Sequence, residues 1–275
     1  MKKALEDISD FMVKNSNKVQ SLEDVKHIAK ISSNGDELVS DLIRTAVDKV
    51  GFDGVINIEE SKSVDTTLDV VEGFTFPSGY AAGAFVTDER RKVVNYEDGL
   101  VFVTDHKLEK VEEMLPILEL AARENKPLVI VAEEIEGQLL AALIVNTMRG
   151  SMKIVAIKAP FYGEQRRDFL DDLSIVTGGK FISRESGIAF SDFKLEHFGK
   201  FSKLESKKLI STVISKNTNY ELLESRLDDL RLRIKEEDNM QECQRMQKRI
   251  NRLASGVAIL KVGGATEIEM TERKH

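Results

Sequence analysis

Several residue types that mark particular protein classes are scarce in this chain. Its 275 residues include a single cysteine, Cys243, so no disulfide can form within it, and we expect a reducing compartment such as the cytoplasm. Tryptophan is absent and aromatic residues make up 6%, which argues against a carbohydrate-binding or base-stacking platform. No apolar run approaches the ~20 residues that span a membrane, and the first residues lack the apolar core of an export signal.

The chain also lacks the motifs of common catalytic and cofactor sites. Neither glycine-rich phosphate loop, G-x-G-x-x-G or G-x-x-x-x-G-K-[ST], occurs, and the G-x-S-x-G nucleophile elbow is missing too. The four histidines show no metal-ligand spacing such as H-x-x-x-H, so we expect no metal site. A formal net charge of -7 does not favour a basic face, so we expect no nucleic-acid partner.

What the chain does contain is enough apolar residues for a packed core. Hydrophobic residues make up 41% and charged residues 32%, a balance typical of a globular protein. Helical spacing predicts two helices before residue 51, and strand patterns follow at 55–58 and 67–71. The stretch after Glu72 is rich in glycine, so Gly73 is a candidate domain boundary.

Short apolar runs and helical patterns alternate through the middle of the chain. The predicted elements are strands at 100–103, 128–132, 153–157 and 180–183, with helices at 107–124, 136–149 and 164–177. Successive strand–helix units favour an α/β fold whose sheet is mostly parallel and flanked by helices. We also expect a β segment at 207–216, a helical hairpin at 220–253, a strand at 257–262 and a partner strand at 266–270.

The reactive side chains have structural explanations. Cys243 lies on the inner apolar stripe of the predicted hairpin, so a buried, unreactive thiol is the favoured interpretation. Glu133, Glu134 and Glu136 could be catalytic carboxylates, but acids before a helix also complement its dipole, and this interpretation is favoured. The arginine pair at 166–167 could grip an anion, but a solvated helix face explains it better.

Two of the predicted helices carry more apolar residues than one buried face requires. In the 136–149 helix, Leu140 and Ile144 lie on one side and Val145 on another, so apolar residues nearly encircle the axis. The 107–124 helix is similarly rich, although a helix on a sheet needs only one stripe about 100° wide. Two interpretations stay open: helices buried on all sides, or an exposed apolar groove that accepts side chains of many sequences.

A series of short motifs runs along almost the whole chain, from about residue 20 to 272. They are LDVVEGF at 68–74, GY at 79–80, EMLPILE at 113–119, KPL at 126–128, VNTMRG at 145–150, AIKAP at 156–160, TGG at 177–179 and KVGGATEIEM at 261–270. In this order and spacing they resemble a group I chaperonin of the GroEL type. That resemblance implies a molecular chaperone whose full-length parent assists protein folding driven by ATP.

The resemblance implies the apical and intermediate domains of such a chaperonin without its equatorial domain. Residues 72–256 would form the apical, substrate-binding domain, and 1–71 with 257–275 a small, discontinuous α+β intermediate domain. Gly73 and Gly256 would be hinges, since glycine accepts large changes in φ and ψ. Because the family's nucleotide loop and catalytic aspartate lie elsewhere, the resemblance implies no catalytic residue, cofactor or ATPase activity here, while ATP and Mg would bind the parent.

The resemblance also assigns a surface that binds non-native polypeptide and a co-chaperonin. Its residues would be Tyr80, Phe85, Leu115, Leu118, Leu140, Ile144 and Val145. Glu267 would contact a neighbour in a ring of identical subunits. The basic residue that usually pairs with it in the family is replaced by Ser78 here, and the family's usual aromatic residue at position 84 is replaced by Ala84. These departures favour a divergent member of the family. The mitochondrial matrix and the plastid stroma are alternatives to a cytoplasmic location, and a phage-encoded protein in the host cytoplasm is another. The fragment itself is expected to be a monomer without a membrane partner.

Two other classes of function stay open on the residues alone. A self-contained α/β enzyme would bind a small molecule at the strand ends, where it would need converging polar residues. A structural scaffold would assemble through the 220–253 hairpin, whose apolar stripes are also explained by packing on the sheet. A deep polar pocket would favour the enzyme, and exposed apolar helices would favour the chaperone.

Overall fold

The structure of the chain is a computed structural model, and it divides into two compact units. It describes residues 21–33, 35–51, 55–61, 65–215, 218–254 and 256–264, together with Ser16 and Val19. One unit consists of Met1–Val70 with Ala258–His275, and the other of Val71–Val257. The domain that the chaperonin resemblance implied, 72–256, has limits one residue inside those of the second unit.

The described residues of the first unit form two helices and three strands. They are α2 (Leu22–Ser32), α3 (Glu37–Val50), β1 (Val55–Glu60), β11 (Gly256–Val262) and the first part of β2 (Thr67–Phe76). Helix α2 begins at a capping box in which Ser21 and Asp24 each accept the other's backbone N–H. In the sheet, β11 lies between β1 and β2. A small core joins Ala46 and Val50 of α3 to Ala258 of β11.

A mixed sheet forms the centre of the second unit. Its strands are β3 (Val94–Thr104), β5 (Leu128–Ala132), β7 (Ile154–Lys158), β8 (Phe181–Ile182), β9 (Gly199–Ser206), β10 (Ser211–Ile214) and the end of β2. β3 pairs in parallel with β5 and β8, and β5 with β7. β9 pairs antiparallel with β3 and β10, and β10 with β2. The α/β class is confirmed, but the sheet is mixed where a mostly parallel one was predicted.

The antiparallel part of the sheet depends on β9, a strand that the sequence pattern does not reveal. The buried apolar side chains of β9 are Phe201 and Leu204. Their spacing of three breaks the period of two that identifies a strand. Gly99 lies opposite Phe201 in the ladder, and a Cβ there would come within 2.3 Å of the ring. The missing side chain at Gly99 therefore makes room for Phe201.

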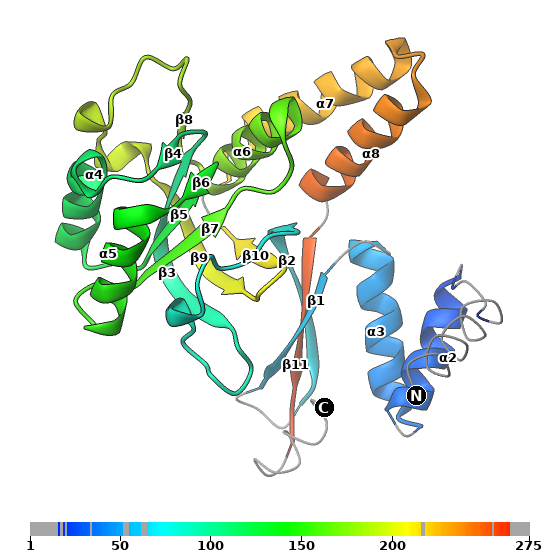
Figure 1. Cartoon of the computed structure of the whole chain (residues 1–275). Coiled ribbons are helices and arrows are strands. Elements are labelled where there is room, and N and C mark those ends of the chain that lie inside the picture. Colours follow the sequence, from blue (N-terminus) through cyan, green and yellow to red (C-terminus); the bar gives the residue numbers. More distant parts are fainter. Residues whose placement is uncertain are drawn as a thin grey trace, which may run out of the picture. The chain divides into compact units, whose positions relative to one another are not determined.

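Helices cover the sheet of the second unit. The elements around the sheet are β4 (Lys107–Leu108), β6 (Glu134–Ile135), α4 (Val111–Glu124), α5 (Gly137–Met148), α6 (Gly163–Thr177) and the short 3-10 helices η1 (Gly83–Phe85), η2 (Phe190–Asp192) and η3 (Leu195–His197). α4 and α5 lie side by side on one side of the strands, and α6 lies on the other (Figure 1). On the α6 side, the ring of Phe169 packs against Phe74 and Phe76, with centroids 5.7 and 5.0 Å away.

The predicted helical hairpin is present and extends away from the sheet (Figure 1). Its helices are α7 (Tyr220–Glu236) and α8 (Met240–Ala254). Leu230, Ile250 and Leu253 are buried in the core of the unit, so the near end of the hairpin is anchored by apolar packing. Cys243 lies on the inner side, as expected, but is only half-buried, and its Sγ lies 3.3 Å from the Glu237 carbonyl oxygen.

Some expectations concern residues at or beyond the limits of the described chain. The partner strand at 266–270 and the inter-subunit residue Glu267 lie outside the described residues. Gly73 pairs with Ile214 in the β2–β10 ladder, and Gly256 is the first residue of β11. Both expected hinges therefore lie in extended strand, close to the limits of the two units.

Candidate functional site

Two short strands hold the first turns of α4 and α5 next to each other. β4 pairs in parallel with β6, with Leu108 opposite Ile135. The N–H of Glu136 donates to the Leu108 oxygen at 3.0 Å, and the N–H of Leu139 donates to the Glu109 oxygen at 3.0 Å. These bonds satisfy N–H groups that the start of a helix leaves without partners. The two helices therefore begin at a fixed separation.

Helix α4 buries one face and exposes an apolar residue beside it. Met114, Ile117 and Ala121 are fully buried in the core. Leu118 is 8% exposed and belongs to the same buried face, whereas Leu115 is 44% exposed. The two α4 residues that the resemblance assigned to a binding surface are thus separated. Leu118 is corrected to a core residue, because a buried side chain offers no area to a partner.

Helix α5 carries apolar residues toward the core and toward the solvent. Leu143 is fully buried. Leu140 and Ile144 are half-buried and pack against the core. Val145 and Met148 are 44% and 74% exposed. One buried stripe would have satisfied the packing of this helix, so the outer apolar residues need a different explanation.

The polar residues of the last turns of α5 bond within the helix. The Asn146 side chain donates to the Ala142 oxygen at 2.9 Å, and the Thr147 hydroxyl donates to the Leu143 oxygen at 2.9 Å. No charged residue occurs in α5, whose sequence is GQLLAALIVNTM. The exposed residues of α5 itself are therefore uncharged, and an exposed arginine, Arg149, follows at its C-cap.

The segment before β3 packs beside α5 and contains two of the assigned residues. Tyr80 is half-buried and forms an isolated bridge with Ile157. Phe85, in η1, has no exposed surface, and η1 contacts α5. Phe85 is therefore corrected from a surface residue to a core residue. Ala84, at the position where the chaperonin resemblance led us to expect an aromatic residue, is exposed.

The structure brings part of the assigned set together on adjacent helices. We define the α4–α5 surface as Leu115, Leu140, Ile144, Val145 and Met148. Met148 is the most exposed of these at 74%, and the assigned set did not include it. The signal that could have found it is its spacing of three from Val145, which places both on one side of the helix.

Glu134 joins the strands beneath α4 and α5 through two ion pairs. Its carboxylate lies 2.8 Å from Lys107 Nζ and 2.8 Å from Lys158 Nζ. Lys107, and then Lys158, lowers the pKa of Glu134 from 4.5 to about 2. Because Lys107 belongs to β4 and Lys158 ends β7, these pairs tie the short strands to the main sheet.

Glu133 is held in a similar way at the end of β5. Its carboxylate lies 2.7 Å from Arg166 Nη1 and 2.9 Å from Arg184 Nη2. The Arg166 side chain is 16% exposed, so it is a structural ion-pair partner and not part of a solvated face. Glu136 is the N-cap residue of α5 and makes no side-chain cap bond. At the strand ends, Glu133 is therefore engaged by cations, which does not favour a role in proton transfer.

Neither a known family nor a metal or membrane-spanning feature accompanies the α4–α5 surface in the described part of the chain. No protein-family model matches the chain. Within the described residues, no group of three or more His, Cys, Asp and Glu side chains could hold a metal ion. Of the helices that the structure describes, none combines the length and the hydropathy needed to cross a lipid bilayer.

Proposed function

We propose that this chain is a chaperone that binds non-native polypeptide through the α4–α5 surface. The observation that carries the proposal is the exposure of apolar side chains on two adjacent helices: Leu115 and Val145 are each 44% exposed and Met148 is 74% exposed. Unfolded chains display apolar segments that folded proteins bury, so such a surface binds them without reading a particular sequence. The absence of charge on α5 removes the desolvation cost that charged side chains would add.

Each contact with this surface is weak on its own. Burying one CH2 group contributes about 0.8 kcal/mol, and side chains lose rotamer freedom when they are held. Met148 suits varied partners because its thioether side chain is flexible and polarizable. In a ring of identical subunits, several copies would engage one client, and the effective affinity would rise steeply.

The proposal includes the family that the sequence motifs resemble. In it, the unit Val71–Val257 acts as the apical domain of a group I chaperonin, and the other unit belongs to the intermediate domain. This chain binds a client, and a co-chaperonin in the same place, but does not hydrolyse ATP, because that family keeps its nucleotide site in the equatorial domain. The lack of a phosphate loop in the sequence supports this division. A cytoplasmic location rests on the single cysteine.

Charge substitutions on the outer face of the two helices test the proposal. Leu115→Glu combined with Val145→Glu should weaken capture of a chemically denatured client, because a carboxylate must lose its water to approach an apolar segment. The matched control is Leu222→Glu with Leu232→Glu on α7, where the residues are 54% and 56% exposed. Binding to immobilised denatured client and suppression of its aggregation measure the effect.

The expected loss of client affinity is about tenfold or more for the α4–α5 variant and within about twofold for the α7 control. Thermal unfolding of all three proteins verifies that they are folded. Capture by the α4–α5 variant at the level of the unmodified protein would contradict the proposal. Equal losses in both variants would also count against it, because binding would then follow total apolar area and not this surface.

A further inference from the structure

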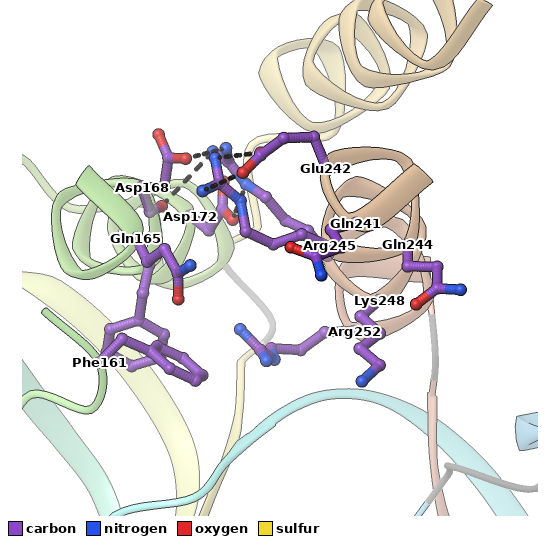
Figure 2. A pocket seen from close by; sticks show the side chains of 12 residues that line it. Phe161, Gln165, Asp168, Asp172, Gln241, Glu242, Gln244, Arg245, Lys248 and Arg252 are labelled. Atoms are coloured by element: carbon purple, nitrogen blue, oxygen red, sulfur yellow. Dashed lines mark hydrogen bonds and ion pairs between the residues drawn. The ribbon is translucent and has the colours of Figure 1, made fainter. Parts of the chain in front are cut away.

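A recess lies between α6 and α8 in the second unit. Its volume is about 370 Å³, which lies within the range of small-molecule sites. Figure 2 shows Arg245, Lys248 and Arg252 on the α8 side, with Phe161 and Gln165 on the α6 side. The recess is thus lined by basic side chains on one wall and by an aromatic ring and an amide on the other.

The carboxylates of this recess are already bound to arginines. Arg249 donates to Asp172 through Nε at 2.5 Å and through Nη2 at 2.8 Å. The same guanidinium pairs with Asp168 through Nη1 at 2.8 Å. Glu242 pairs with Arg245 at 3.0 Å. A cationic ligand would have to break these pairs, so the recess does not favour one.

The recess holds three carboxylates and four cationic side chains, so that Lys248 and Arg252 leave one positive charge in excess. Both lie on the same α8 face as Arg245, at helical spacing. Burial lowers the pKa of Arg252, and the attraction of the nearby Asp172 opposes this only in part. A bound anion would stabilise the charged guanidinium of Arg252.

Phe161 gives the opposite wall a flat apolar surface. Its φ of +67° is a conformation that bulky residues rarely adopt. The guanidinium of Arg252 lies 5.1 Å from the centroid of the Phe161 ring. Aromatic rings and planar guanidinium groups both stack against flat groups. The recess therefore combines a stacking surface with neighbouring cations.

We propose that this recess binds a small molecule that joins an anionic group, phosphate or carboxylate, to a planar ring. Lys248 holds the anionic group, and the ring packs against Phe161 and Arg252. The site uses none of the residues of the α4–α5 surface. It adds a small-molecule ligand to the polypeptide partner proposed above and does not depend on that proposal.

Calorimetry with phenyl phosphate tests this site, and benzoate tests a carboxylate in place of the phosphate. Inorganic phosphate carries only the anion and phenol carries only the ring, so each should bind about tenfold more weakly than phenyl phosphate. Lys248→Gln with Arg252→Gln should weaken phenyl phosphate binding by about tenfold or more, because the charged hydrogen-bond donor of Lys248 and the stacking surface of Arg252 are lost. The matched control is Arg233→Gln with Lys235→Gln, at exposed positions of α7, which should stay within about twofold.

Each outcome decides the proposal. A loss in the recess variant alone supports it. The absence of binding by both phenyl phosphate and benzoate at millimolar concentration overturns it, and so do equal losses in the two double variants, which indicate general attraction to a charged surface. Circular dichroism verifies folding, and if the recess variant is unfolded, Phe161→Leu replaces it. That substitution must weaken phenyl phosphate but leave inorganic phosphate unchanged, and any other result overturns the proposal.

Discussion

At the scale of single residues, Glu134 shows how one carboxylate organises the elements beneath the α4–α5 surface. Lys107, followed by Lys158, lowers its pKa from 4.5 to about 2. A carboxylate whose folded-state pKa is depressed contributes stability above its unfolded pKa, and this contribution is lost as the pH falls through the folded value. The contribution of Glu134 should therefore be complete above pH 4.5 and disappear as the pH falls toward about 2.

An NMR titration of the Glu134 carboxyl group checks this expectation. The midpoint should lie at about 2, so the group should stay ionised down to about pH 3. Lys107→Gln should raise the midpoint more than Lys158→Gln, because Lys107 makes the larger contribution. A midpoint near 4.5 in the unmodified protein would mean that the two ion pairs do not form in solution.

The sequence predicts the helices of the candidate surface but not the direction of each side chain. Leu115 and Leu118 lie one turn apart on α4, yet they are 44% and 8% exposed. Both belong to a broad apolar stripe, and which edge of the stripe faces water depends on what packs against it. Phe85 lies in η1, and η1 contacts α5, which is distant in the sequence. Helical spacing carries no information about such contacts.

At the scale of elements, a buried ion pair joins the α7–α8 hairpin to α6. Arg249 and Asp172 have side chains only 12% and 1% exposed. Burial raises the pKa of Asp172, although the hydrogen bond and the charge of Arg249 oppose this. Removing one member of such a pair leaves the other charge buried without its partner. The attachment of the hairpin should therefore be sensitive to either residue.

Two arginine substitutions on α8 separate a buried ion pair from an exposed one. Arg249→Gln should lower the free energy of unfolding by about 3 kcal/mol. Arg245→Gln breaks an exposed pair with Glu242 on the same helix and should cost less than about 1 kcal/mol. Urea denaturation measures both changes. Similar costs for the two variants would show that Asp172 does not hold a buried cation in solution.

Elements with a strong local pattern are predicted best from the sequence. The strand expected at 128–132 is β5, and the hairpin expected at 220–253 closely matches α7 and α8. Helix α4 begins at Val111 and not at 107, because Lys107 and Leu108 pair with β6. The mixed character of the sheet was not foreseen, since β9 acquires its strand conformation from pairing on both edges and not from its own pattern.

At the scale of the whole molecule, the second unit carries both candidate sites. The α4–α5 surface and the recess between α6 and α8 lie on different helices. Client binding in this account requires only the unit Val71–Val257. Because one copy of the surface is small, a single chain should hold a client weakly, and assembly of several copies should strengthen capture without any new contact.

The most direct test of the central claim is a photo-crosslinking measurement. A photoreactive amino acid replaces Met148, which is 74% exposed on α5, or Leu232, which is 56% exposed on α7 and serves as the matched control. With a denatured client present, we predict crosslinks to the client from position 148 and few or none from position 232. Equal crosslinking from both positions, or none from position 148, would contradict the account.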